Sequence, residues 1–241
     1  MSSLNTRIRE IAAAPIATIP DVVQAFEAIE SLLPEDDGLR WFNWLYLTVT
    51  KAVDISVVAR QWNNPEWLAR LDVVFARLYL NALRDGLSDR PSAPRCWQIM
   101  LSARQNRCLA RIQFATAGMN AHIDHDLCMA VVTTCRDMGL VPDRGSPLYA
   151  DYTQVNVLLE ALIDEAKKGL RVGLLGDAIP DLGKMEHLLA GFGIQAAREA
   201  AWSSAELLWH LQKEPLLSKR YVSGLDRATA LAGMGLLIPV L

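Results

Sequence analysis

The sequence predicts an all-α protein folded as a single-domain helical bundle. Of its 241 residues, 51% are hydrophobic. The β-branched residues lie within windows of helical period, whereas strands would place them in short alternating runs between turns. A chain of this length can bury roughly 70% of its unfolded surface, so its core does not need a disulfide or a structural metal. No internal repeat, low-complexity segment or change in composition divides the chain, so one domain is expected over 1–241.

Proline, glycine and capping residues divide the chain into the expected helices. Asp21 after Pro20 and Asn64 before Pro65 are typical of helix starts, and Gly139 is typical of a helix end. Residues 1–20 are expected to form an N-terminal extension. The expected helices span about 21–33, 39–60, 65–86, 95–139 with a break near Asn106, 148–170, 181–192, 194–213 and 222–237. Segment 112–138 is expected to be a buried central helix, packed by the helices at 39–60, 65–86 and 148–170.

Composition and charge exclude several classes of protein. The 24 Lys and Arg against 27 Asp and Glu give a net charge of −3, which is not the basic footprint of a nucleic-acid-binding protein. No run approaches the ~20 apolar residues of a membrane span, and the N-terminus lacks the continuous apolar stretch of a signal peptide. The cysteines form no C-x-x-C pair and are expected to be reduced. We therefore expect a cytoplasmic protein, and a homo-oligomer remains open.

The most informative segment runs from Ile112 to Cys135. Its small and apolar residues occupy every helical face, which is typical of a helix buried on all sides. Its middle carries four ionisable residues, and burial of such groups is costly unless they are paired, hydrogen-bonded or bound to metal. These candidate catalytic residues are His122, Asp124, His125 and Asp126.

On an α-helix, His122, His125 and Asp126 project from one face and Asp124 turns away. Two imidazoles and a carboxylate suit Zn²⁺ or Fe²⁺ with an open position for water or substrate. The same residues suit metal-free proton transfer, with a carboxylate orienting a histidine. A third interpretation is structural, with the histidines fixing helix register. Asp72 and Asp151 are further candidate ligands, although each also suits a capping or interhelical role, and Asp151 suits a pair with Arg144.

Other polar and aromatic residues lie in apolar helical surroundings and are candidates to line the same cavity. The H-E-x-x-H motif, the G-x-S-x-G elbow and the glycine patterns of phosphate-binding loops are absent. The isolated histidines, at 187 and 210, are expected at the surface or at an interface. The candidate substrate-binding residues are Asn43, Trp44, Tyr46, Tyr79, Asn120 and Asn156.

Five segments together resemble the domain-of-unknown-function family numbered 5995. They are FNWLYLTVT (42–50), LDVVFARLYLNAL (71–83), QFATAGMNAHIDHDL (113–127), ADYTQVNVLL (150–159) and LDRATALAGMGLLIP (225–239). They are spread in order over about four fifths of the chain, and the third is distinctive. Family members usually read His-Ile-Asn where this chain has His122-Ile123-Asp124. The resemblance implies a helical single domain and brings no activity, substrate or catalytic residue.

Two functions from different classes are expected. The first is an enzyme that acts on a small, largely apolar metabolite in an interhelical cavity, using the His-x-x-His-Asp cluster for metal binding or acid–base catalysis. A cyclase, lyase or hydrolase of specialised metabolism suits such a site. The second is a non-catalytic helical module that binds an apolar ligand or a protein partner, and its His/Asp cluster is structural.

Overall fold

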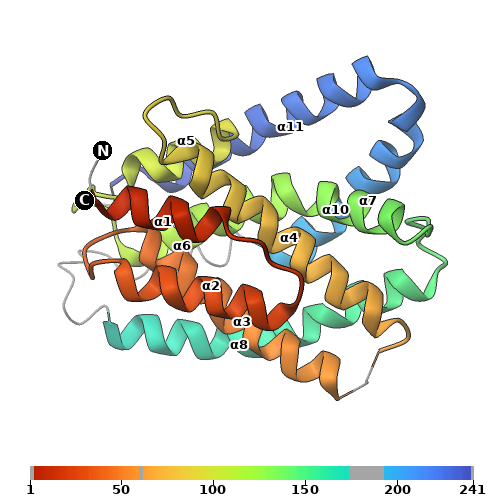
Figure 1. Ribbon diagram of the computed structural model, residues 1–241, viewed down its shortest axis with the longest axis horizontal. Helices are drawn as coiled ribbons and strands as arrows, with labels where there is room; N and C mark the ends of the chain where they lie inside the picture. The colour runs from red at the N-terminus through yellow and green to blue at the C-terminus, as the bar shows by residue number, and fades with distance from the viewer. Residues whose placement is uncertain (1–2, 60–61, 174–192, 240–241) are drawn as a thin grey trace.

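The computed structural model of the chain is an assembly of helices (Figure 1), with no strand in the part of the chain that it describes. It describes residues 3–59, 62–173 and 193–239, and the side chains of all these except 163–173. The α-helices are α1 (Ser3–Ala13), α2 (Ile19–Leu32), α3 (Leu39–Val58), α4 (Pro65–Gly86), α5 (Arg95–Ala103), α6 (Arg111–Met119), α7 (Leu127–Asp137), α8 (Pro147–Gly173), α10 (Ile194–His210) and α11 (Pro215–Leu236). A π-helical segment, η1 (Asn120–Asp126), joins α6 to α7, and a short 3-10 segment, η3 (Leu211–Lys213), joins α10 to α11.

The helices share one hydrophobic core. Its buried side chains come from α1 through α11, with Ile8 near one end of the chain and Ala230 near the other. In Figure 1, α3 and α8 lie together on one side of the molecule and α11 lies on the opposite side. The continuous rod α6–η1–α7 runs between them. The all-α fold class predicted from sequence is confirmed.

The rod α6–η1–α7 is buried along nearly its whole length. Every residue from Ile112 to Ile123 is buried, and η1 contacts α4, α5, α10 and α11 as well as its two neighbours in the chain. Close packing requires a glycine at 118, because a Cβ there would overlap the ring of Phe42 on α3. The apolar residues on every face of this segment are explained by helices that pack on each side of it.

The capping residue at the start of α4 is the one predicted from the sequence, and the capping residue of α2 is a different one. Asn64 caps α4, and its side chain accepts a hydrogen bond from the backbone N–H of Trp67. The cap of α2 is Thr18, not Asp21 as expected. Asp21 lies one turn into the helix, and its side chain accepts from the backbone N–H of Thr18, while the Thr18 hydroxyl accepts from the N–H of Asp21. This reciprocal capping box places the start of α2 before Pro20.

Three further segments differ from expectation. Part of the expected N-terminal extension is helix α1, whose Ile8 and Ala12 are fully buried and which packs against α2 and α4. The predicted break near Asn106 is a loop between α5 and α6, and η1 interrupts the expected α-helix again. The end of this region is as predicted, since Gly139 has a φ of +68° after α7. Helix α11 begins at Pro215, earlier than the expected 222.

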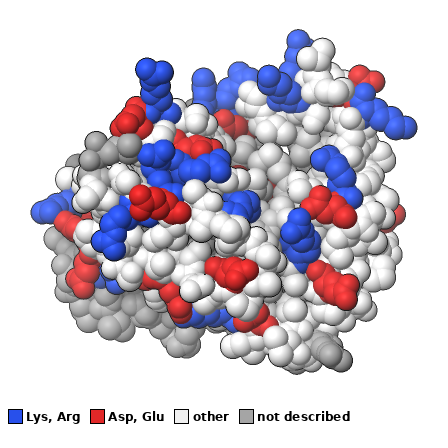
Figure 2. Space-filling view, in the orientation of Figure 1, with Lys and Arg blue, Asp and Glu red and all other residues white. Residues whose placement is uncertain are grey.

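The surface in Figure 2 carries charges of both signs, with Lys and Arg gathered along the edge near α5 and α11. Of the described helices, none is both long enough and apolar enough to cross a membrane. The described cysteines are free, as expected. The predicted helix near 181–192 and His187 lie outside the described residues.

Candidate active site

Asp126 is the centre of a buried hydrogen-bond cluster on η1. Its Oδ2 lies 3.0 Å from Nδ1 of His122, and its Oδ1 lies 2.7 Å from Nδ1 of His125. The indole N–H of Trp97, on α5, donates to Oδ2 over 2.9 Å. All four residues are buried. Burial by itself would raise the pKa of Asp126, but the hydrogen bonds from His122 and His125 hold it below its ordinary value. Asp126 is therefore ionised, and each histidine carries its proton on Nδ1.

The π-helical geometry of η1 is what separates the two histidines. A π-helix closes its hydrogen bonds from i to i+5, so its turn is wider than that of an α-helix. The imidazoles of His122 and His125 consequently contact opposite oxygens of the Asp126 carboxylate, and each ring has different neighbours. Single π turns within α-helices occur frequently at functional sites. Asp124 is half-buried, no hydrogen bond joins it to either histidine, and burial raises its pKa to about 6.

His122 is held by aromatic rings. Its imidazole stacks on Phe75 at a centroid distance of 3.5 Å and an interplanar angle of 6°, and the ring of Tyr46 lies 4.6 Å away. The Nε2 atom is buried and has no hydrogen-bond partner. Burial lowers the pKa of His122 below its ordinary value, although Asp126 acts in the opposite direction. At neutral pH the ring is therefore neutral, with an unused lone pair on Nε2.

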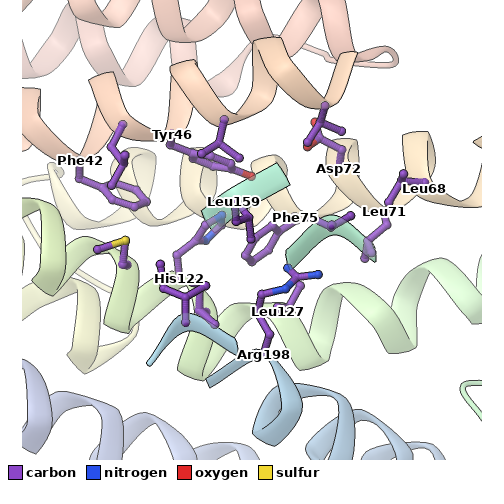
Figure 3. Close-up of a pocket in the computed structure, with 17 residues that line it drawn as sticks. Phe42, Tyr46, Leu68, Leu71, Asp72, Phe75, His122, Leu127, Leu159 and Arg198 are labelled. Atoms are coloured by element: carbon purple, nitrogen blue, oxygen red, sulfur yellow. The ribbon is translucent and has the colours of Figure 1, made fainter. Parts of the chain in front are cut away.

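His122 lines a cavity of about 100 Å³ enclosed by α3, α4, the rod α6–η1–α7, α8 and α10. Most of the lining is aliphatic or aromatic. In Figure 3, Tyr46 and Asp72 enter from one side and His122 and Arg198 from the other. An apolar cavity with a few convergent polar groups is typical of a small-molecule site.

The polar atoms of this wall are unusual because they lack partners. Among the described residues, seven buried side-chain nitrogen or oxygen atoms make no hydrogen bond. Three of the seven belong to residues that line this one cavity, namely the Tyr46 hydroxyl, Asp72 Oδ2 and His122 Nε2. Buried polar atoms are normally paired, and exceptions often mark a function or a bound molecule.

The charges of Asp72 and Arg198 are strongly affected by burial. Burial, with the carboxylate of Asp54 nearby, raises the pKa of Asp72 from 3.8 to about 7. Arg198 donates from Nε to Asn156 Oδ1 and from Nη2 to the carbonyl of Tyr152, each over 2.7 Å. Burial lowers the pKa of Arg198, but a guanidinium remains charged at neutral pH. Within the described residues, no carboxylate forms an ion pair with Arg198.

Comparison with known proteins identifies the family. A model described as a family of unknown function, DUF5995, matches residues 19–239. The chain belongs to this family. The resemblance carried by the segment around His122 is therefore confirmed. No curated protein and no solved structure matched the chain.

One of the six substrate-binding candidates of this DUF5995 member, Tyr46, lines the cavity. Asn156 contributes indirectly, by holding Arg198. The other four have packing or bonding roles elsewhere. Asn43 accepts from the Tyr79 hydroxyl over 3.3 Å and donates to the Phe26 carbonyl and to Glu30, Asn120 donates to the Thr229 carbonyl, and Trp44 packs against the core.

The expected metal ligands are not arranged around one point. His122 and His125 both direct Nδ1 at Asp126, so the carboxylate is engaged by the imidazoles and not open to an ion between them. Asp72 lies in the cavity wall. Asp151 accepts from the backbone N–H groups of 63 and 64 and from the Asn63 amide. Asp151 thus connects α8 to the start of α4 through buried hydrogen bonds. The expected pair between Asp151 and Arg144 is not present, because Arg144 pairs with Glu199 and Glu206 of α10.

Neither Trp97 nor Arg198 is among the site residues predicted from the sequence. Of these, Arg198 had a usable signal, because it falls on the buried stripe of α10 that includes Ala201 and Trp202. A charged residue at a core position of an amphipathic helix requires a partner or a function. Trp97 has the pattern of an ordinary core residue, and only the packing of α5 against η1 gives it a contact with the cluster.

Proposed function

We propose that this protein is an enzyme that transfers protons on a small, largely apolar molecule bound in the cavity beside His122. The observation that carries the proposal is that Tyr46, Asp72 and His122 line one apolar cavity and each has a buried polar atom without a partner. Leaving such an atom unpaired costs about 1–3 kcal/mol. A bound molecule that satisfies these atoms accounts for their retention.

His122 is the proposed general base. Asp126 fixes the tautomer with the proton on Nδ1, so the Nε2 lone pair is available to accept a proton in the cavity. The imidazolium that forms is stabilised by the buried carboxylate on its other side. The hydrogen bond from Trp97 holds that carboxylate in place, and the stacked ring of Phe75 holds the imidazole.

Asp72 is the proposed general acid. With a pKa of about 7, a large fraction of this carboxyl is protonated at neutral pH. Environments that lower the pKa of one group and raise that of another produce a base and an acid in one site. His122 removes a proton from the substrate, and Asp72 returns a proton to the product. Steps of this kind occur in the cyclases, lyases and hydrolases of specialised metabolism.

The cavity limits the substrate. Its volume of about 100 Å³ is below that of an engineered apolar cavity of about 150 Å³ that binds benzene. The bound part is therefore no larger than a single ring or a short branched chain. The Tyr46 hydroxyl and the Arg198 guanidinium both donate hydrogen bonds, so the molecule carries a carbonyl or carboxylate oxygen that accepts them.

A second candidate is a non-catalytic binding protein. It is favoured by the hydrogen bond between Trp97 and Asp126, which joins α5 to η1 and suits a purely structural cluster. In that case the cavity still holds an apolar ligand, but His122 transfers no proton.

Deuterium exchange distinguishes the two candidates. The protein is incubated in D₂O with small carbonyl compounds such as acetone and cyclopentanone, and deuterium at the carbon next to the carbonyl is measured by mass spectrometry. The wild type is expected to accelerate exchange, and His122→Gln is expected to lose roughly 10²-fold or more of that rate. His210→Gln serves as the control, because His210 is exposed on α10.

Binding is measured separately, by the shift in melting temperature that benzene produces. A benzene shift in both the wild type and His122→Gln, with exchange lost only in the variant, supports the enzyme. A benzene shift without accelerated exchange in the wild type favours the binding protein. Exchange that His122→Gln leaves unchanged refutes the assignment of His122 as the base.

A further inference from the structure

A second group of metal-ligating side chains includes His125, the other histidine bound to Asp126. Cys96 on α5, His125 on η1 and Asp226 on α11 place one ligand atom each within 4.8 Å of one another. Cys96 and His125 are buried and Asp226 is half-buried. Three helices that are distant in sequence therefore bring a sulfur, a nitrogen and an oxygen to one point.

His125 is oriented for coordination. Its Nδ1 is bound to Asp126 Oδ1 at 2.7 Å, which leaves Nε2 as the ligand atom. Metal-bound histidines almost always donate their other ring N–H to a carboxylate or carbonyl, and this second bond fixes the tautomer and raises ligand basicity. Asp126 supplies that bond here. The carboxylate itself accepts a hydrogen bond from the Trp97 indole over 2.9 Å, which holds it in place.

Asp226 is fixed as well. Its Oδ1 accepts from the backbone N–H of Cys96 over 3.0 Å and its Oδ2 from that of Arg95 over 3.1 Å. It thus caps α5, whose own N-cap residue is Pro94, which has no side-chain donor or acceptor. Capping explains why a carboxylate is present at this position. It does not explain why the cysteine sulfur and a ring nitrogen of a carboxylate-bound histidine both lie within 4.8 Å of a carboxylate oxygen of Asp226.

The sulfur, nitrogen and oxygen ligand atoms of this group indicate which metal ion it can bind. We propose that Cys96, His125 and Asp226 form a binding site for a divalent, thiophilic metal ion, for which zinc is the best match. Thiolate, imidazole and carboxylate are the three ligand types of protein zinc sites, and three protein ligands leave a fourth position for water. A thiolate and a carboxylate together balance the charge of the ion. Burial, with Asp126 and Asp226 nearby, raises the pKa of the Cys96 thiol in the metal-free protein, and coordination reverses this by displacing the proton.

Such an ion ties α5, η1 and α11 together, and through Asp126 it fixes the segment that carries His122. The proposal of this site does not rest on the proposed proton transfer. Metal binding alone tests the zinc site, and deuterium exchange alone tests the proton transfer.

Zinc binding is measured on protein produced without a polyhistidine tag, stripped with a chelator and then dialysed against zinc chloride. About one tightly bound zinc ion per chain is expected. X-ray absorption of the zinc-loaded wild type is expected to show one sulfur ligand at about 2.3 Å, together with nitrogen and oxygen ligands. This measurement needs no variant. Absence of bound zinc, or bound zinc without a sulfur ligand, overturns the proposal.

Variants then assign the ligands. Cobalt chloride is added to the stripped protein, and the thiolate-to-cobalt charge-transfer absorption is recorded. Cys96→Ser is expected to lose this band, whereas Cys135→Ser, which alters another buried cysteine, is expected to keep it. Asp126→Asn is expected to weaken zinc binding by about 10- to 100-fold through its effect on His125. A band that persists in Cys96→Ser refutes the assignment.

Discussion

Replacing Asp72 with Asn is expected to stabilise the protein at neutral and alkaline pH. The wild-type carboxyl has one oxygen enclosed without a partner in an apolar cavity, and its pKa is raised from 3.8 to about 7. Asn has nearly the same shape as a protonated Asp and carries no charge. The substitution therefore removes the cost of placing a carboxylate in this environment and leaves the packing unchanged.

The size of the effect follows from the raised pKa of Asp72. Between pH 4 and pH 7, folded Asp72 binds more protons than unfolded Asp72, so the free energy of unfolding falls as pH rises through this window. A pKa raised from 3.8 to about 7 corresponds to about 4 kcal/mol, at about 1.36 kcal/mol for each pKa unit. Asp72 is only half-buried as a whole residue. Water therefore screens part of this cost, and about 2 kcal/mol is expected at pH 8.

Urea denaturation of the wild type and Asp72→Asn at several pH values measures this difference. The two proteins are expected to unfold alike at pH 4 and to diverge as the pH rises to 7, with Asp72→Asn the more stable. Asp89→Asn, at an exposed position, controls for the loss of a negative charge and is expected to show no such divergence. Equal stability of Asp72→Asn and the wild type at pH 8, or an equal difference at pH 4 and pH 8, would refute the reasoning. Under the proposed function, the same variant also loses deuterium exchange.

Three further substitutions test the packing around the site by urea denaturation. Asp151→Ala removes a buried carboxylate that accepts three hydrogen bonds and is expected to cost about 3–5 kcal/mol; a loss below 1 kcal/mol would contradict its role in connecting α8 to α4. Gly118→Ala forces a methyl group into an aromatic ring of α3 and is expected to cost about 1–3 kcal/mol, whereas Gly224→Ala, with open space around it, is expected to gain about 0.5–1 kcal/mol; the same sign in both would exclude the steric explanation. Trp97→Phe removes an N–H that binds the ionised Asp126 and is expected to cost about 1.5–3 kcal/mol, and an unchanged stability would show that the bond contributes nothing.

The helices themselves could be predicted from local patterns. The Asn64-Pro65 start of α4 and the Gly139 end of α7 follow from single residues whose backbone preferences act alone. The predicted start of α2 is wrong because Pro20 lies inside the helix. Proline is tolerated in the first turn, where its missing N–H would have no partner. Helix α1 cannot be predicted from local patterns, because its stability comes from burial of Ile8 and Ala12 against other helices.

The candidate site was predicted in part. Charged residues on a segment that is apolar on every face must have partners, which predicts His122, His125 and Asp126 as one cluster. The predicted geometry is that of an α-helical turn. The π-helical turn of η1 is wider than an α-helical turn, so the two imidazoles contact different groups. His122 stacks on Phe75, whereas His125 lies near Cys96 and Asp226.

The sequence by itself determined that the protein is helical and that its ionisable cluster is buried, because periodicity and the cost of desolvation act along a single segment. Only the tertiary structure decided what each member of the cluster faces. Phe75 and Arg198 reach the cavity, and Cys96 and Asp226 reach His125, from helices far away in the sequence. The way these helices pack depends on the shapes of many side chains together. A contact between distant helices is therefore not encoded in the spacing of residues within either one.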